Sequence, residues 1–577
     1  MTGRWLNSRI KRRILKPVSR FEKSATRFSI SGETAPPPFD MISARSETVM
    51  DKQAKKHFVP GAMVSLCVLV TCFYPWPAHA AEPDQPAWPT NEWRMSTPEE
   101  QGMDSSALAG LVGYGSSHNF DSLLVVRHGR IVAEAYYAPY TAGIPHEIYS
   151  STKAVTGTLL GMVYKDGLLD RLDHPILDFF ADRQVANVDD RKKAITVQNL
   201  LDMTSGLDWD QGFEGGRQQS MKDLYRSSNW TQFILDRPMA HPPGEVFNYS
   251  NGNADLVSAI ITRLTGKLAE DYAREKLFDP LGIVDWHWDR DPQGLTKGEG
   301  MLYLLPRDMA KLGYLYLHHG EWEGRQLLPP GWADVLNHTL VNVHATGDAN
   351  ESYSNFIWVF PDRHVYRMDG KNGQLIVVFP DLDVVVVTTA RKQVRYKALI
   401  DAVSGAVKSQ SALPPDPDGA KQLASAIQDA ATQKPTPVGP VSEIASSISG
   451  KIYKFHDDEV GLKSFTLDLA DPHPHFDVEI SLPDPVGSSV RYSQPIGLDG
   501  FYRRGAVKLS DPGIGQITEA KGRWLNGQTF VIDVPVLGSG EQQELILTFS
   551  GKKLNFRRRV AVGEGEDVSV DGVQVSN

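Results

Sequence analysis

The chain is long enough for two domains, and its composition excludes several classes of protein. Its 577 residues include 60 lysine and arginine against 70 aspartate and glutamate residues, which gives a net charge of -10. Binding to nucleic acid through phosphates needs a basic face, so this charge argues against a DNA- or RNA-binding protein. With only 2 cysteines, the chain has neither a disulfide framework nor a cysteine-rich zinc site.

The first 80 residues have the features of a leader. Residues 1–49 are basic, rich in serine and proline and without apolar periodicity, so Met50 is a candidate translation start. Residues 50–80 have a lysine-rich start, an apolar run and a final Ala-His-Ala, as a secretory signal peptide does. An uncleaved anchor is the alternative, but two prolines interrupt the run and it is short for a membrane span. We therefore expect cleavage near Ala80 and a secreted or periplasmic protein with no stable membrane span.

Helical and strand signals alternate over residues 81–412. Apolar runs on both sides of His128-Gly129 predict a hairpin over residues 122–136. Helices are expected from Ser150 onward and over 253–265 and 307–318, and strands over 374–379 and 383–389. The order is strand, many helices, strand, without a βαβ rhythm. This order predicts a mixed α/β domain of the α+β type, with an antiparallel sheet and a large helical region.

The composition changes after this domain. Residues 413–446 are rich in proline and alanine and are typical of a linker with one short helix. Residues 447–577 contain short alternating runs at regular spacing, which predict a separate all-β domain, either a sandwich or a barrel. The clearest expected strands are 451–455, 464–469, 475–482, 505–509, 529–534 and 544–549.

A serine followed three residues later by lysine is the first candidate for chemistry. The sequence has no G-x-S-x-G elbow, no H-E-x-x-H and no phosphate-binding loop, but S-x-x-K occurs at 8–11, 150–153 and 550–553. Only Ser150 opens an amphipathic helix, where it shares a face with Lys153. The lysine can hold or accept the proton of the hydroxyl, and the helix N-terminus favours developing negative charge. The alternative is that Ser150 is an N-cap and Lys153 a solvated charge.

Two further motifs complete the candidate site. Tyr-x-Asn occurs twice, and Tyr249-Ser250-Asn251 is preferred over Tyr353-Ser354-Asn355, because it follows a loop and precedes a helix. Tyr249 would act as general base if the lysine lowered its pKa.

The third motif, Lys371-Asn372-Gly373, runs directly into a strand. The N–H groups of Gln374 and Ser150 would form an oxyanion hole, and Gly373 would let substrate approach the backbone. Lys371 would supply positive charge or be an ordinary turn lysine.

In this order the three motifs resemble those of the serine β-lactamase and penicillin-binding-protein superfamily. The Tyr-Ser-Asn form is typical of the class C branch, which also holds D-aminopeptidases, esterases and 6-aminohexanoate-dimer hydrolases. The stretch MDGKNGQLIVVFPDLDVVVVTT at 368–389 is most similar to the last group and its esterase relatives. The resemblance covers about residues 88–411. It departs from that group at Lys371, where a histidine is frequent.

The resemblance implies an antiparallel sheet flanked by helices, an all-helical region and a site in the cleft between them. Ser150 would attack a carbonyl, Lys153 and Tyr249 would move protons, and Asn251 and Lys371 would orient groups. No metal or organic cofactor is implied. The substrate would be a small molecule or short peptide: a 6-aminohexanoate-oligomer-like amide, an ester, a D-peptide or a β-lactam. A penicillin-binding or cell-wall-sensing protein without turnover is the alternative.

The sequence leaves the oligomeric state open. Because all three motifs precede the linker, we expect the site to be complete without the β-domain.

Overall fold

The computed structural model describes residues 88–212, 217–343, 350–456, 461–481, 489–507, 516–562 and 567–575. The predicted leader and signal peptide, and the S-x-x-K at 8–11, lie outside these ranges. The described residues belong to one compact unit. Within them, no helix is both long enough and apolar enough to cross a lipid bilayer.

The N-terminal domain is built on a sheet that is antiparallel except for its edge strand β1, which runs parallel to β3. The strands lie in the order β1 (Arg94–Met95), β3 (Arg130–Tyr136), β2 (Phe120–Arg127), β14 (Val384–Ala390), β13 (Gln374–Phe379), β12 (Val365–Gly370), β11 (Ile357–Phe360), β10 (Ser352–Ser354), β9 (Val341–Asn342). The predicted hairpin is β2–β3. Its turn residues His128 and Gly129 have φ of 48° and 67°, the left-handed backbone that a tight two-residue hairpin turn needs.

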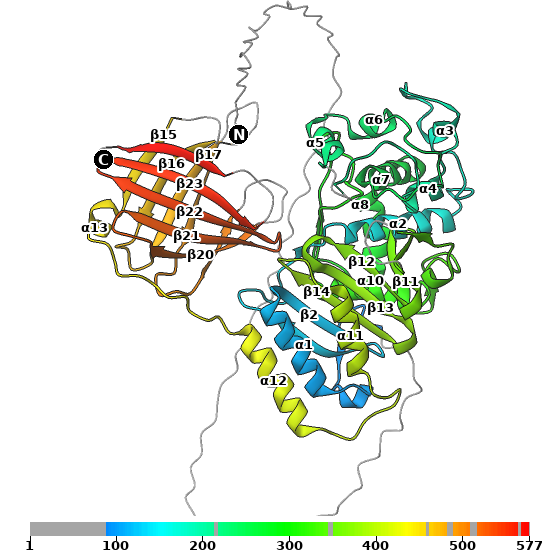
Figure 1. Cartoon of the computed structure of the whole chain (residues 1–577), viewed down its shortest axis with the longest axis horizontal. Helices are drawn as coiled ribbons and strands as arrows, with labels where there is room; N and C mark the ends of the chain where they lie inside the picture. Colours follow the sequence, from blue (N-terminus) through cyan, green and yellow to red (C-terminus); the bar gives the residue numbers. More distant parts are fainter. Residues whose placement is uncertain are drawn as a thin grey trace, which may run out of the picture. The chain divides into compact units, whose positions relative to one another are not determined.

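Alternation along the strands gives this sheet two buried faces. On one face, Leu123 and Val125 of β2 pack with α1 (Ser105–Ser117), α11 (Tyr396–Ala406) and α12 (Pro417–Ala431). Figure 1 shows these three helices together on one side of the strands. On the other face, Leu124 and Val126 belong to the core that includes α2 (Ser151–Lys165), α7 (Asn251–Thr265) and α10 (Pro306–Leu317).

The helical region lies between β3 and β9 in the sequence. Besides α2, α7 and α10 it contains α3 (Asp190–Lys193), α4 (Val197–Leu201), α5 (Gln219–Arg226), α6 (Trp230–Leu235), α8 (Ala269–Ala273) and α9 (Asp279–Leu281). A small sheet, in the order β4 (His146–Glu147), β6 (Leu302–Leu304), β5 (Trp286–Trp288), and a hairpin, β7 (Glu321–Trp322) with β8 (Arg325–Gln326), also lie here. The predicted fold class is confirmed.

The C-terminal β-domain is one antiparallel sheet that curls toward a barrel. After α13 (Ala445–Ile448), its strands are β15 (Lys451–Phe455), β16 (Leu462–Asp468), β17 (His475–Ser481), β18 (Ser489–Pro495), β19 (Arg503–Val507), β20 (Gln516–Trp524), β21 (Thr529–Leu537), β22 (Glu541–Ser550), β23 (Lys553–Val562), β24 (Val568–Gln574). Each strand pairs with the next one in the sequence, except that β18 does not pair with β19. Because β24 pairs with β15, the strands form one sheet whose two edges are β18 and β19.

A side chain bridges the two edges. Gln494 of β18 donates from Nε2 to the carbonyl of Arg503 on β19 at 3.1 Å and accepts from Thr518 of β20 at 2.6 Å. Of the two predicted architectures, the structure therefore has the barrel-like one.

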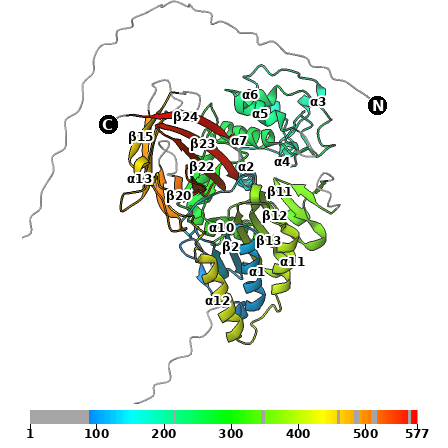
Figure 2. The same ribbon diagram turned by 60° about the vertical axis from the view of Figure 1, so that its left-hand side comes forward.

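The predicted linker contains a helix that is part of the N-terminal domain's core. Helix α12 lies alongside α1, as both views show (Figure 2). Its Leu423 and Ala430 are buried in the core with α1 and α11, and the N–H of Ala138 donates to the carbonyl of Ala430 at 2.9 Å. The predicted domain boundaries stay predictions, but a cut near residue 412 would leave this core open.

Leu423→Ala should destabilise the N-terminal domain by about 2 to 4 kcal/mol, because it opens a cavity beneath α12. Leu525→Ala is the control, since Leu525 is 64% exposed. Calorimetry should show a lower transition temperature for the first variant only. Equal transition temperatures would mean that the Leu423 side chain contributes nothing to the domain's stability.

Candidate active site

Ser150 and Lys153 meet at the first turn of α2. The Lys153 Nζ donates to Ser150 Oγ at 2.9 Å and to the carbonyl of Glu299 at 2.8 Å. The lysine side chain is fully buried, and Ser150 makes no side-chain capping bond to the helix. Ser150 therefore stands at the N-cap position without capping the helix through its side chain, and Lys153 is buried rather than solvated as in the alternative interpretation.

Glu299, whose carbonyl accepts from Lys153, follows Gly298, and hydrogen bonds from α2 and α7 hold Gly298 in place. Thr156 of α2 donates to the carbonyl of Gly298 at 2.8 Å, and the N–H of Gly298 donates to Asp255 of α7 at 2.9 Å. Asp255 is buried, and its pKa lies well above the ordinary value, first because of desolvation and then because of the charge of Glu299. No local sequence pattern marks this segment, and Glu299 was not predicted as a site residue.

Tyr249 lies against the buried ammonium. The Lys153 Nζ is 5.0 Å from the centroid of its ring, which also stacks on Trp358 at 5.9 Å. The second candidate, Tyr353, is a fully buried residue of β10 and contacts Tyr249 edge to face at 6.4 Å. Burial raises the pKa of Tyr353 well above its ordinary value. Of the two tyrosines, Tyr249 is therefore the one beside Lys153.

Asn251 is the first residue of α7, and its side chain is only partly satisfied by hydrogen bonds within the described residues. Ser250 caps the helix, and the Asn251 Nδ2 donates to Glu299 Oε2 at 3.2 Å. The backbone N–H of Asn251 donates to Gln211 at 3.1 Å. Within the described residues, its buried Oδ1 has no hydrogen-bond partner. A buried amide oxygen of this kind is a ready acceptor for a ligand N–H.

The third motif forms the 3₁₀ turn Lys371–Gly373 between β12 and β13. Gly373 has φ of 92°, and a Cβ there would lie 2.3 Å from a methyl carbon of Val394. The glycine is therefore required by its own chain, a reason different from the predicted approach of substrate. Ser151 donates to the carbonyl of Gln374 at 2.8 Å, which ties the start of α2 to the start of β13.

A cavity of about 400 Å³ opens beside Ser150. Of the predicted residues, Ser150, Asn251 and Lys371 line it, while Lys153, Tyr249, Gly373 and Gln374 do not. The wall also contains four charged residues that were not predicted from the sequence: Glu147, Lys297, Glu299, Glu541. Because Glu541 belongs to the β-domain, the wall is not complete within residues 81–412, contrary to the expectation from the motif positions.

Glu147 has an unusual protonation equilibrium. Burial raises its pKa from 4.5 to about 8, with further increases from Glu299, Asp289 and Glu541 and a decrease from Lys297. At neutral pH this carboxyl is mostly protonated. In the part of the chain that the structure describes, no cluster of His, Cys, Asp and Glu has the arrangement of a metal site.

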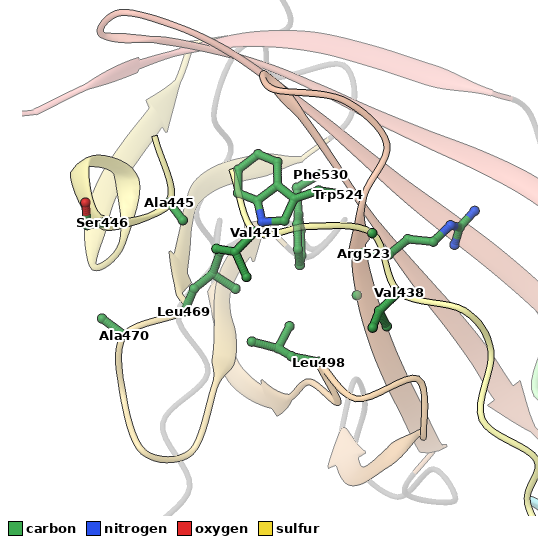
Figure 3. A pocket seen from close by; sticks show the side chains of 12 residues that line it. Val438, Val441, Ala445, Ser446, Leu469, Ala470, Leu498, Arg523, Trp524 and Phe530 are labelled. Atoms are coloured by element: carbon green, nitrogen blue, oxygen red, sulfur yellow. The ribbon is translucent and has the colours of Figure 1, made fainter. Parts of the chain in front are cut away.

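The β-domain has an apolar cavity of about 270 Å³. Figure 3 shows the side chains around it, among them Val441, Leu469, Leu498, Trp524, Phe530. Arg523, which also lines the cavity, forms an ion pair with Asp533 at 3.0 Å. Among the lining residues that the structure describes, no nucleophile lies beside an acid or base.

The sequence matches a known protein family over most of the N-terminal domain. A family model described as Beta-lactamase matches residues 99–403, more than half of the sequence. The chain belongs to the Beta-lactamase family. The resemblance predicted from the three motifs is confirmed, and the match contains all of them. Assignment to the class C branch stays a prediction.

Relatives of this Beta-lactamase family member include the 6-aminohexanoate-dimer hydrolase of Paenarthrobacter ureafaciens, 23% identical over 228 residues, which are 37% of this chain and 56% of the relative. Protein flp of Staphylococcus aureus (strain MW2) is 28% identical over 171 residues, 28% of this chain and 33% of the relative. The chain thus spans about half and about a third of these relatives. The solved octameric penicillin-binding protein homologue from Pyrococcus abyssi is 16% identical, with a TM-score of 0.42, and the match covers 79% of this chain and 99% of that one.

The wild-type protein should become less stable to unfolding as the pH rises from 5 to 8, and Glu147→Gln should make this decrease smaller. Because the folded protein holds a proton on Glu147 up to about pH 8 and the unfolded chain releases it near 4.5, rising pH favours unfolding across this window. Melting temperatures at both pH values measure the difference. Asp121, whose pKa burial raises to about 7, contributes equally to both proteins.

Glu443→Gln, at an exposed position, is the control and should behave as the wild type. The same pH dependence in Glu147→Gln and wild type would show that Glu147 is ionised in the folded protein.

Proposed function

We propose that this chain is a secreted serine hydrolase that forms an acyl-enzyme on a small amide or ester. The observation that carries the proposal is the 2.9 Å contact between Ser150 Oγ and the Nζ of a fully buried lysine. Membership in a family of hydrolases supports it. The second candidate, a penicillin-binding protein without turnover, uses the same contact and differs only in the fate of the acyl group.

In the proposed reaction, Ser150 Oγ attacks the substrate carbonyl carbon. For this step the Lys153–Tyr249 pair holds one proton fewer than an ammonium plus a phenol, so that it accepts the hydroxyl proton of Ser150 and then returns it to the leaving group. The backbone N–H groups of Ser150 and Gln374 donate to the oxyanion of the tetrahedral intermediate. Water then attacks the acyl carbon and frees Ser150. The tie between Ser151 and Gln374 supports this geometry, because it holds the two donor segments together.

Substrate binding would use the polar wall of the cavity. Asn251 would accept an N–H of the substrate through its unpartnered Oδ1, and Lys371 would orient a carbonyl or carboxylate. A volume of about 400 Å³ suits a small substrate. One relative is named for the dimer of 6-aminohexanoate, which supports a linear amide among the candidates. The others are a carboxylic ester, a D-peptide and a β-lactam.

Export would use the predicted signal peptide at residues 50–80. Its layout of basic start, apolar run and Ala-His-Ala supports cleavage near Ala80 and a secreted or periplasmic location.

Ser150→Ala should abolish steady turnover of a p-nitrophenyl ester, because the only proposed nucleophile is removed. Ser550→Ala is the matched control, since it changes the serine of another S-x-x-K, in the β-domain, and should keep wild-type turnover. Turnover that survives in Ser150→Ala would contradict the assignment. A stoichiometric burst without turnover in the wild type would favour the non-turnover candidate.

Tyr249→Phe should lower kcat for the same ester by roughly 10²- to 10⁴-fold, the usual effect of losing general acid–base catalysis. Tyr353→Phe should have a far smaller effect, because Tyr249 lies against Lys153 while Tyr353 packs edge to face on Tyr249. Steady-state kinetics of the two variants test this directly. A larger loss for Tyr353→Phe would reverse the assignment of the two Tyr-Ser-Asn motifs.

A further inference from the structure

The turn between β21 and β22 contacts the segment that carries the nucleophile. The N–H of Glu147 donates to the carbonyl of Gly538 at 2.7 Å, and the hydroxyl of Tyr149 donates to the carbonyl of Ser539 at 2.5 Å. Gly538 has φ of 87°, and a Cβ there would lie 2.1 Å from the carbonyl of Pro145. Only glycine allows the turn to come this close.

Apolar packing supports the same contact. Leu537, the last residue of β21, packs with Tyr140 and Ile144. Arg504 of β19 donates to the carbonyl of Pro139 at 2.9 Å. The turn is therefore held against the N-terminal domain by hydrogen bonds and by a small apolar cluster.

The turn also reaches the Lys-Asn-Gly motif. A Cβ at Gly540 would stand 3.8 Å from both the Asn372 amide nitrogen and the Tyr149 hydroxyl. Tyr149, with φ of 47°, immediately precedes Ser150. The turn thus lies between two segments that the proposed function uses.

Glu541 follows this turn and contributes a carboxylate to the cavity that Ser150 and Lys371 line. Its backbone N–H donates to Ser539 Oγ at 3.2 Å, which fixes the start of β22. Its negative charge raises the pKa of Glu147, another residue of the cavity wall. Glu541 lies far outside residues 99–403, so the family match does not include it.

We propose that Glu541 is a specificity-determining residue that favours substrates whose acyl group ends in an ammonium over those ending in a carboxylate. The inference rests on the proposed function, since it concerns the substrates of the same site. A carboxylate in the cavity wall attracts a cationic end and repels an anionic one. Removing its charge therefore changes the two in opposite directions, whatever the balance of the other charges in the wall.

The test uses the full chain and three p-nitrophenyl esters whose acyl chains have equal length and end in methyl, ammonium or carboxylate. The readout is the ratio of kcat/KM for the ammonium ester to that for the carboxylate ester, so a general loss of activity cancels. Glu541→Gln should lower this ratio by roughly 6- to 900-fold. One unit charge at about 8 Å changes each ester by roughly 2.5- to 30-fold between solvent-like and protein-like screening, and the two changes multiply because they have opposite directions. Glu541→Lys should lower it further.

Glu544→Gln is the matched control, because Glu544 lies on the same strand and pairs with Arg559. It should keep the wild-type ratio. Melting curves of both glutamine variants establish that they are folded.

A ratio in Glu541→Gln equal to that in Glu544→Gln, with turnover of the esters intact, would overturn this inference alone. Absence of Ser150-dependent turnover of all three esters in the wild type would overturn the proposed function and this inference with it.

Discussion

The buried ammonium of Lys153 is the interaction on which the rest of the site depends. A charge removed from water is costly unless it is paired or hydrogen-bonded. Here the carbonyl of Glu299 and the hydroxyl of Ser150 accept from it at 2.8 and 2.9 Å, and the ring of Tyr249 covers it. These groups come from α2, from the segment before β6 and from the loop before α7. Folding that satisfies the lysine therefore also assembles the candidate site.

A second constraint comes from the β-domain. Its β21–β22 turn is narrow because Gly538 has no side chain, and so its carbonyls reach Glu147 and Tyr149 on the strand and turn that lead into α2. The N-terminal domain carries the groups proposed for chemistry, while the β-domain contributes to the wall that substrate meets. The β-domain therefore helps to form the cavity beside Ser150, which could not be inferred from its own apolar cavity or its strand pairing.

The features that the sequence predicted are local ones. Ser150 and Lys153 are three residues apart in one helical turn, and Gln374 begins β13 where the apolar run begins.

Glu299 and Glu541 were missed because they reach the cavity through long-range packing, and Gly538-Ser539-Gly540 has the composition of any hairpin turn. Helix α12 was assigned to a linker because its segment is rich in proline and alanine, yet Leu423 completes a core. Gly373 was predicted to let substrate approach the backbone, and the close contact that a Cβ there would make with Val394 could not be predicted from the sequence.

The most direct test of the account is to find the covalent intermediate. The full chain is mixed with a slowly turned-over ester, quenched in acid and digested, and the peptides are analysed by mass spectrometry. We expect a mass increase equal to the acyl group on the peptide that contains Ser150. It should appear before steady turnover and disappear as substrate is consumed. Hydrolysis with no acylated peptide, or an acyl group on any other residue, would contradict it.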